Sequence, residues 1–308
     1  MRVAFLFPGQ GSQHVGMGKA LFDNCPPARQ IYEEAADALG YDIGTLSFEG
    51  PKEELNKTFR TQPSILTASI AALRCIEDNG IHPTVVAGHS LGEYSALVAA
   101  GVLAFGDAVK LTEMRGTFMQ ESVPEGKGMM AAILGLERDN VDSICLSVTS
   151  GYVAPANYNC PGQIVIAGET QAVEEALEIA KESGAKRAVP LAVSVPSHCT
   201  LMVDASKRLA EVLKNVEFNE PKVPIVNNAD AMFLNTTDSI KASLVKQLDS
   251  PLLWEDSITA IIDSGIDAFV EIGPGKVLCG LLRRLDSSTI CYNVDNPESL
   301  VRTLELLK

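Results

Sequence analysis

The sequence predicts an α/β fold with a largely parallel sheet, and three observations lead to this prediction. Short β-branched runs alternate with longer helical patterns along most of the chain, as they do in proteins built from parallel strands joined by helices. The 308 residues are 46% hydrophobic and 21% charged, which is an ordinary globular composition with enough apolar residues for a sizeable core. From about Gly128 to Val195 the pattern changes, which indicates a second, smaller domain.

The elements of the larger domain are expected towards both ends of the chain. Strands are predicted at Val3–Phe7, Thr84–Ala87 and Ala268–Ile272, and helices at Gln62–Asn79 and Gly92–Ala100. The strand segments are short and apolar on both faces, which is typical of strands buried in a parallel sheet. No internal repeat or low-complexity tract interrupts this alternation.

The middle of the chain predicts a different order of elements. The expected segments are strand Met129–Leu134, helix Arg138–Val148, strand Val153–Tyr158, a turn at Pro161-Gly162, strand Gln163–Ala167, helix Gln171–Ser183 and strand Lys186–Leu191. This βαββαβ order is that of the ferredoxin-like unit. We therefore predict a small domain at residues 127–195, inserted into a discontinuous large domain of residues 1–126 and 196–308. A cleft between two domains is the usual place for a ligand.

The charge of the chain excludes two classes of partner. The net charge is −14, whereas binding to the phosphates of nucleic acids requires clustered Lys and Arg. An anionic membrane surface would repel the protein for the same reason.

The cysteines and the first residues predict a cytoplasmic protein with free thiols. The seven cysteines are odd in number and scattered, with no CxxC pair, unlike the dense disulfide frameworks of small secreted domains. The apolar run at residues 3–7 is too short for a signal peptide and ends in a Pro-Gly turn. No apolar stretch is long enough to span a bilayer, and no H-E-x-x-H or paired-cysteine spacing predicts a metal site.

The strongest local motif is GHSLG at residues 88–92, which matches the G-x-S-x-G nucleophile elbow. A predicted strand precedes it and a predicted helix follows it, as the elbow requires. The two glycines permit a sharp turn that leaves the Ser90 hydroxyl exposed at the helix N-terminus, where the backbone N–H of Leu91 can donate to an oxyanion. The alternative is a glycine-rich turn in which Ser90 only caps the helix.

A serine nucleophile needs a general base, and the chain has four histidines. His89 follows the tight turn and should point away from the Ser90 hydroxyl, while His82 and His14 lie in expected connecting segments. His198 lies where the chain returns from the small domain to the large one, at the border of the cleft. Position and elimination therefore favour His198 as the base, and a structural histidine is the alternative.

Two further features are ambiguous from the residues alone. The loop PGQGSQ (8–13) fits neither a dinucleotide fingerprint nor a phosphate loop, because its glycine spacing is wrong for both. It can supply a second oxyanion donor or be a simple turn.

Arg115, on a helix expected to begin after an N-cap at Asp107, shares a face with Leu111 and Phe118. Such an arginine is either part of a structural ion pair or a clamp on a substrate carboxylate.

These motifs, taken together, resemble the malonyl-CoA:acyl carrier protein transacylase family. The resemblance extends along essentially the whole chain through PGQGSQ (8–13), TQPSILTASIA (61–71), GHSLGEYSALV (88–98), EMRGTFMQ (113–120), NYNCPGQIVIAG (157–168), SVPSHCTLM (194–202), VPIVNN (223–228), VKQLDSPLLW (245–254) and EIGPGKVL (271–278). Each segment is modest evidence, but their number, order and spacing are highly specific.

The resemblance implies an α/β-hydrolase-like large domain with a ferredoxin-like insert. It implies that Ser90 is the nucleophile and His198 the base, with Gln247 orienting the histidine through its backbone carbonyl. The oxyanion hole would be formed by the backbone N–H groups of Gln10 and Leu91, and Arg115 would bind the malonyl carboxylate.

The implied function is transfer of the malonyl group of malonyl-CoA to the phosphopantetheine thiol of acyl carrier protein. The mechanism would be ping-pong through a malonyl-serine ester, would need no cofactor beyond the substrates, and would supply fatty acid biosynthesis. We expect a monomer that binds neither nucleic acid nor membranes. A hydrolase with the same serine and histidine is the first alternative, and a non-catalytic carrier-binding subunit is the second.

Carrier proteins are themselves acidic, as the resemblance implies, so the long-range field between the partners should be repulsive. Docking then requires a local basic patch. The adjacent pairs Lys186-Arg187 and Arg283-Arg284 are the candidates in the sequence, with ordinary solvated surface charges as the alternative.

Overall fold

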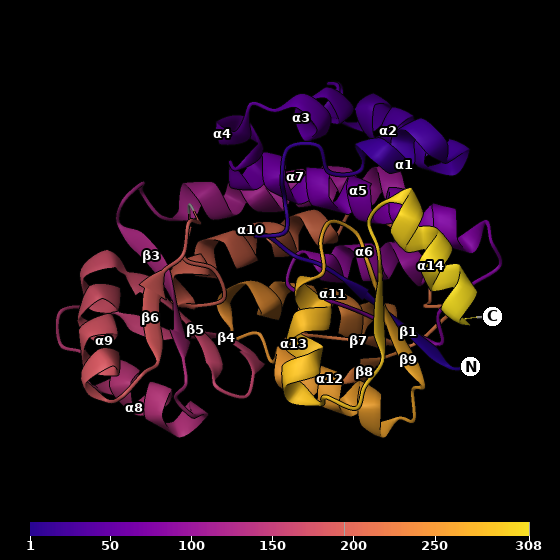
Figure 1. The fold of residues 1–308 in the computed structure, drawn as a ribbon. Helices are drawn as coiled ribbons and strands as arrows, with labels where there is room; N and C mark the ends of the chain where they lie inside the picture. Colours follow the sequence, from indigo (N-terminus) through magenta and orange to yellow (C-terminus); the bar gives the residue numbers. More distant parts are fainter. Residues whose placement is uncertain (194, 308) are drawn as a thin grey trace.

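The larger sheet runs through the centre of the large domain, with helices on both of its faces (Figure 1). The computed structural model describes residues 1–193 and 195–307, so residues 194 and 308 of the predicted domains lie outside the described residues. The sheet has the order β10-β9-β1-β2-β7-β8, and its strands are parallel except β8. Its strands are β1 Val3–Phe7, β2 Val85–Gly88, β7 Ile225–Val226, β8 Phe233–Leu234, β9 Ala268–Ile272 and β10 Cys291–Val294.

The helices of the large domain cover both faces of this sheet. They are α1 Lys19–Asn24, α2 Pro26–Leu39, α3 Ile43–Glu49, α4 Lys52–Leu55, α5 Thr58–Glu77, α6 Gly92–Ala99, α7 Phe105–Ser122, α10 Val203–Leu213, α11 Thr237–Asp249, α12 Trp254–Asp263, α13 Val277–Leu285 and α14 Pro297–Leu307, with a 3-10 turn at Thr200–Met202. No helix among the described residues is both long and apolar enough to cross a membrane.

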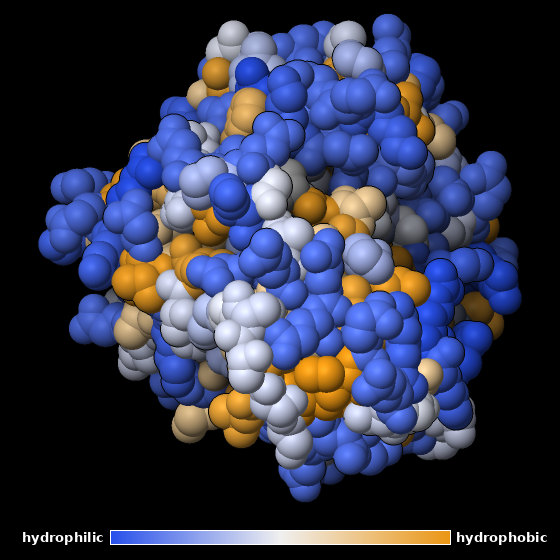
Figure 2. Space-filling model, turned by 90° about the vertical axis from the view of Figure 1, so that its left-hand side faces the viewer, coloured by the Kyte–Doolittle hydropathy of each residue, from blue (hydrophilic) through white to orange (hydrophobic). Residues whose placement is uncertain are grey.

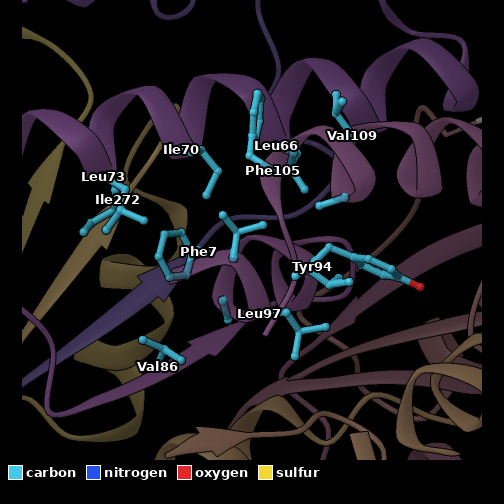
Figure 3. Close-up of a cluster of buried hydrophobic side chains, with 14 of the residues drawn as sticks. Phe7, Leu66, Ile70, Leu73, Val86, Tyr94, Leu97, Phe105, Val109 and Ile272 are labelled. Atoms are coloured by element: carbon cyan, nitrogen blue, oxygen red, sulfur yellow. The ribbon is translucent and has the colours of Figure 1, made fainter. Parts of the chain in front are cut away.

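Strand β1 shows why both faces must be covered. Phe5 and Phe7 pack into one apolar cluster with residues of α5, α6 and α7, while Ala4 and Leu6 pack into a second cluster with α12 and α13. Side chains alternate between the faces of a strand, so an apolar strand buries both. Figure 3 shows the first cluster, in which Phe7 lies among side chains from α5 and α6.

The small sheet is antiparallel and lies beside the large domain (Figure 1). Its strands are β3 Gly128–Leu134, β4 Val153–Cys160, β5 Gln163–Glu169 and β6 Arg187–Pro190, in the order β4-β5-β3-β6, and its helices are α8 Arg138–Ser147 and α9 Thr170–Glu182. Alternate residues of β3 separate the faces: Ala131 and Ile133 pack under α8 and α9, while Met130 and Ala132 pack with Cys199 of the large domain.

Edge strand β4 joins the small sheet to the large domain. The Tyr158 backbone N–H donates to the Leu252 carbonyl at 2.9 Å, and the Leu252 N–H donates to the Ala156 carbonyl at 2.8 Å. Arg138 of α8 forms ion pairs with Glu255 and Asp256 of α12 at 3.1 and 2.8 Å. These contacts hold one side of the cleft in a fixed position.

The predicted α/β class, the largely parallel sheet and the βαββαβ order of the middle segment are confirmed. The predicted N-cap at Asp107 is wrong, because α7 begins at Phe105 after Ala104. Phe105 is buried in the core, so starting the helix earlier places an apolar side chain inside, and Asp107 still interacts favourably with the first turn.

The prediction that all cysteines are free thiols is also wrong. Cys25 is bonded to Cys75, and Cys279 to Cys291, whereas Cys145, Cys160 and Cys199 are free and buried. The Cα atoms of the two bonded pairs are 6.3 and 5.5 Å apart, within the range that a disulfide spans. Spacing along the sequence gave no sign of these pairs, because the packing of α2 on α5 and of α13 on β10 creates them.

Candidate active site

The turn from β2 to α6 presents the Ser90 side chain at the cleft. Ser90 has φ 53°, a left-handed conformation that non-glycine residues rarely adopt. The flanking glycines are required by close approach: a Cβ on Gly88 would lie 1.9 Å from the Gly92 carbonyl, and a Cβ on Gly92 would lie 2.1 Å from the Phe7 carbonyl oxygen. The backbone geometry is therefore that of the elbow predicted from the motif.

His198 contacts Ser90 directly. The two atoms Ser90 Oγ and His198 Nε2 are 2.8 Å apart, and His198 Nδ1 lies 2.7 Å from the backbone carbonyl oxygen of Gln247. A carbonyl only accepts, so Nδ1 carries the proton and Nε2 is free to accept from the Ser90 hydroxyl. Burial, followed by the nearby charge of Arg115, lowers the pKa of His198 to about 3. The imidazole is thus neutral at physiological pH and can take a proton from the serine.

His89 points away from the Ser90 hydroxyl, as expected for the residue next to it on the turn. Its Nε2 lies 2.8 Å from Asn159 Oδ1, and its ring packs edge-on against Trp254. Burial lowers the pKa of His89. The residue therefore helps to hold the small domain against the elbow, since Asn159 belongs to β4.

The two predicted oxyanion donors belong to segments that approach each other at the Ser90 turn. Leu91 is the N-cap residue of α6, and Gln10 follows β1 and lines the pocket. Neither backbone N–H donates to another described residue. The two segments approach closely, because a Cβ on Gly9 would lie 2.3 Å from the His89 carbonyl oxygen. Two free N–H groups beside a serine hydroxyl can stabilise a developing oxyanion.

Arg115 lines the pocket and is only 1% exposed. Its Nη1 donates to Gln62 Oε1 at 2.8 Å, and its Nη2 donates to Gln247 Oε1 at 2.9 Å and approaches Ser90 Oγ at 3.4 Å. Among the described residues, no carboxylate lies within ion-pair distance of Arg115, and its Nε has no hydrogen-bond partner. A buried guanidinium without a carboxylate is costly unless a ligand provides one.

The pocket itself is small and enclosed by both domains. It has about 80 Å³ of free volume and is lined by Gln10, His89, Ser90, Arg115, Met119, Met130, Asn157, Leu191, Val193, Val195, Ser197 and His198. Four of the predicted site residues therefore line one pocket: Gln10, Ser90, Arg115 and His198. Leu91 follows Ser90 in the chain, and Gln247 contacts Ser90, His198 and Arg115.

Three contributors were not predicted from the sequence. Gln62 on α5 binds Arg115, and Asn228 accepts from the Ser90 backbone N–H at 2.7 Å. Glu93 of α6 accepts from Gln247 Nε2 at 2.8 Å. The only available signal was that these residues stand within the motifs TQPSILTASIA, VPIVNN and GHSLGEYSALV, which do not indicate what each side chain contacts.

The α/β fold and the contact between Ser90 and His198 fit a serine-dependent acyl transferase or hydrolase, and comparison with known families favours the acyl transferase. The model of the acyl transferase domain family matches residues 4–302, and the chain belongs to this family.

The chain is similar to proteins named malonyl CoA-acyl carrier protein transacylase. It is 49% identical over 305 residues to that of Escherichia coli (strain K12), covering 98% of this chain and 99% of the relative. It is 47% identical over 309 residues to that of Bacillus subtilis (strain 168), covering 100% and 98%.

Solved structures agree with these relatives. A malonyl-transacylase in complex with a type II PKS acyl-carrier protein superimposes with a TM-score of 0.97 at 47% identity, over 99% of this chain and 100% of that chain. The malonyl CoA-acyl carrier protein transacylase of Coxiella burnetii gives a TM-score of 0.97 at 44% identity, over 99% and 97% of the two chains.

Proposed function

We propose that this chain transfers the malonyl group of malonyl-CoA to the phosphopantetheine thiol of acyl carrier protein, through an ester on Ser90, and so supplies fatty acid biosynthesis. The observation that carries the proposal is the buried Arg115, which lies beside the Ser90–His198 pair and lacks a carboxylate partner among the described residues. The malonyl group has a free carboxylate, and a guanidinium binds such a group through two parallel hydrogen bonds. The names of the relatives support the same substrates.

In the first half-reaction the malonyl carboxylate pairs with Arg115, which orients the thioester carbonyl towards Ser90. His198 Nε2 takes the hydroxyl proton as Ser90 Oγ attacks the carbonyl carbon. The tetrahedral oxyanion accepts hydrogen bonds from the backbone N–H groups of Gln10 and Leu91, and loss of one such donor typically costs about 2.7–4 kcal/mol. When the carbon–sulfur bond breaks, His198 returns the proton to the departing thiolate of coenzyme A.

In the second half-reaction the carrier thiol takes the place of coenzyme A. His198 accepts the thiol proton while the sulfur attacks the ester carbonyl. The same oxyanion forms, and the bond to Ser90 Oγ breaks as His198 returns the proton to the serine. No redox step occurs, so no cofactor is required beyond the two substrates.

A single mass-spectrometric experiment tests this function. The protein is mixed with malonyl-CoA, and the mass of the intact chain and of its peptides is measured before and after carrier protein is added. The proposal requires a malonyl adduct on Ser90 that disappears as malonyl-carrier forms. Free malonate produced at the same rate with or without carrier protein would instead identify a hydrolase.

The finer description of the fold belongs with this proposal. We assign residues 1–126 and 196–308 to an α/β-hydrolase-like domain and residues 127–195 to a ferredoxin-like domain. The parallel order β10-β9-β1-β2-β7 supports the first assignment, and the antiparallel order β4-β5-β3-β6 supports the second.

The position of basic residues supports a docking face on the small sheet. Leu134 pairs with Gln163 on one side and with Arg187 on the other, so these three side chains point to the same face. Met130, on the same face, lines the pocket. Arg284 donates to Gln163 Oε1 at 2.7 Å. The exposed side chains of Arg187 and Arg284 thus lie on either side of a row of β3 side chains, from Leu134 to Met130, that leads to the mouth of the pocket.

The other members of the two predicted pairs point elsewhere. The Lys186 stem lies against Gly135, and Arg283 lines a separate cavity with Tyr292. We therefore assign Arg187 and Arg284, rather than the complete pairs, to carrier docking. Figure 2 shows the side of the molecule occupied by the small domain, where hydrophilic side chains cover most of the surface between scattered apolar patches.

We also propose a cytoplasmic location and a monomeric state. The location rests on the use of coenzyme A and carrier protein as substrates, because the two disulfides remove the argument from free thiols. Rapid alkylation of intact cells, followed by mass spectrometry of Cys25 and Cys279, would test whether these thiols are bonded in that compartment.

A further inference from the structure

The strained backbone of Ser90 is held from both sides by side-chain amides. Its N–H donates to Asn228 Oδ1 at 2.7 Å, and its carbonyl oxygen accepts from Gln247 Nε2 at 3.1 Å. A non-glycine residue with φ 53° costs of order 1–3 kcal/mol and persists only where its surroundings enforce it. These two bonds are therefore part of what keeps the Ser90 hydroxyl in the cleft.

One carboxylate oxygen organises both of these bonds. Glu93 Oε2 accepts from the Asn228 backbone N–H at 3.1 Å and from Gln247 Nε2 at 2.8 Å. Glu93 lies in the first turn of α6 and is only 1% exposed. Among the described residues it has no ion-pair partner, and Ser243 supplies a further hydrogen bond.

The contacts of Gln247 show what the Glu93 carboxyl group achieves. The Gln247 Oε1 atom faces the Arg115 guanidinium, while its Nε2 atom faces two acceptors, Glu93 Oε2 and the Ser90 carbonyl. Rotation of the amide by 180° would place an oxygen against both acceptors and an NH₂ group against Arg115. Each mismatch would leave a buried polar group unpaired. The acceptor oxygen of Glu93 on one side and the Arg115 cation on the other thus fix a single orientation.

Gln247 also connects this network to the base, because its backbone carbonyl accepts from His198 Nδ1 at 2.7 Å. Ser90, His198 and Arg115 are therefore all bound by one glutamine. The orientation of that glutamine depends on Glu93.

We infer that Glu93 is a positioning residue for acyl transfer, which acts through the Gln247 amide and the Asn228 backbone to set the conformation of Ser90 and the direction of Arg115. The inference rests on the proposed malonyl transfer and goes beyond it. Glu93 does not touch the substrate. Its carboxyl group is separated from Arg115 by the Gln247 amide, so that the guanidinium stays available for the incoming carboxylate.

A second buried glutamate provides a matched control. Glu271 is also fully buried and also accepts a backbone N–H, from Cys279 at 2.8 Å. Among the described residues it forms no hydrogen bond or ion pair with a site residue. Burial raises the pKa of both Glu93 and Glu271 to about 7. A change of either to glutamine removes a buried acid of the same kind, but only the change at Glu93 reaches the site.

The test compares Glu93→Gln with Glu271→Gln in single-turnover formation of the Ser90 ester from malonyl-CoA and from acetyl-CoA. Glu93→Gln keeps the size and an acceptor oxygen but allows the Gln247 amide to rotate. We expect malonyl ester formation to fall by about 10- to 100-fold, up to the cost of misplacing the reacting groups by about 1 Å, with a smaller loss for acetyl. Glu271→Gln should form both esters at the wild-type rate.

Equal rates for Glu93→Gln and Glu271→Gln would overturn the inference, as would a proportionate loss for both acyl groups. If the wild type forms no ester on Ser90, the proposed function fails instead, so the two failures are distinguishable.

A second variant keeps the inference open to refutation if Glu93→Gln does not fold. Gln247→Met removes the amide and retains the backbone carbonyl that binds His198. It should shift the malonyl-to-acetyl ratio in the same direction. In the double variant Glu93→Gln/Gln247→Met, the malonyl-to-acetyl ratio should equal that of Gln247→Met alone, because the effects of two residues that act through one another are not additive. Independent, additive changes in the ratio, or no shift in Gln247→Met, would overturn the role of the amide.

Discussion

Replacement of Arg115 should separate malonyl from acetyl transfer. The guanidinium is 1% exposed and has no carboxylate partner among the described residues, so the malonyl carboxylate would complete a buried pair. Removal of one member of a buried charge pair costs about 3–5 kcal/mol. At 1.36 kcal/mol per tenfold change in rate, Arg115→Ala should lower kcat/KM for malonyl-CoA by roughly two to four orders of magnitude. The acetyl group has no carboxylate, so its transfer should persist or rise.

The same reasoning predicts an unusual effect on stability. An unpaired buried cation is unfavourable in the empty pocket, so Arg115→Met, which restores the lost volume, should unfold at the same denaturant concentration as the wild type or a higher one. The assay is single-turnover acylation of Ser90 by each donor, together with urea unfolding. Arg138→Ala is the control, because it removes an ion-paired arginine between the domains and should affect both donors equally. Equal loss of malonyl and acetyl transfer in Arg115→Ala, with a lower unfolding midpoint in Arg115→Met, would refute the clamp and favour a structural role for Arg115.

Three further predictions address the nucleophile, the partner and the pH dependence of stability. Ser90→Ala should abolish the malonyl adduct in mass spectrometry, and an adduct that persists on another residue would contradict the mechanism. Arg187→Glu and Arg284→Glu should each raise the KM for carrier protein without slowing self-malonylation. Added salt should change the rate of the carrier reaction more than the rate of self-malonylation, because electrostatic steering is screened over about 8 Å at physiological ionic strength. Unchanged KM values in both variants would place docking elsewhere. Burial raises the pKa of Glu271 from 4.5 to about 7, so the folded state binds the proton more tightly and stability falls as pH rises through this window. The free energy of unfolding of Glu271→Gln, measured with urea, should therefore rise by about 3 kcal/mol relative to the wild type as the pH is raised from 4.5 to 8. A difference between the two proteins that does not change with pH would show that this carboxyl group does not cause the pH dependence.

The parts of the fold that the sequence predicted are those with a local pattern. Strand β1 is apolar at every position, and the elements of the small domain alternate at the expected lengths, so both were found to within a few residues. Strands β7 and β8 were missed because each spans two residues, too short for a periodic signal. The disulfides were missed for a different reason, since they depend on helix packing between distant segments.

The site residues, like the fold, could be predicted from the sequence only where a local pattern marks them. GHSLG predicted the geometry at Ser90 because two glycines and a serine at fixed spacing define the turn. The role of Gln247 followed only from the family resemblance, since a backbone carbonyl leaves no trace in a sequence. Glu93 and Asn228 could not be assigned, because their function depends on hydrogen bonds between segments more than 130 residues apart along the chain.

The network also explains why a carbonyl, rather than an acid, orients His198. In the usual serine triad a carboxylate binds the Nδ1 proton and stabilises the imidazolium. Here Arg115 approaches the same serine hydroxyl as His198, at 3.4 Å. A carboxylate beside His198 would be attracted to that guanidinium and would compete with the substrate for it. The neutral carbonyl of Gln247 orients the histidine without adding a charge. The one acid in the network, Glu93, is kept apart from Arg115 by the Gln247 amide. Under the proposed function, selectivity for a carboxylated acyl group and the use of a carbonyl to orient His198 are therefore two consequences of the same arrangement of charges.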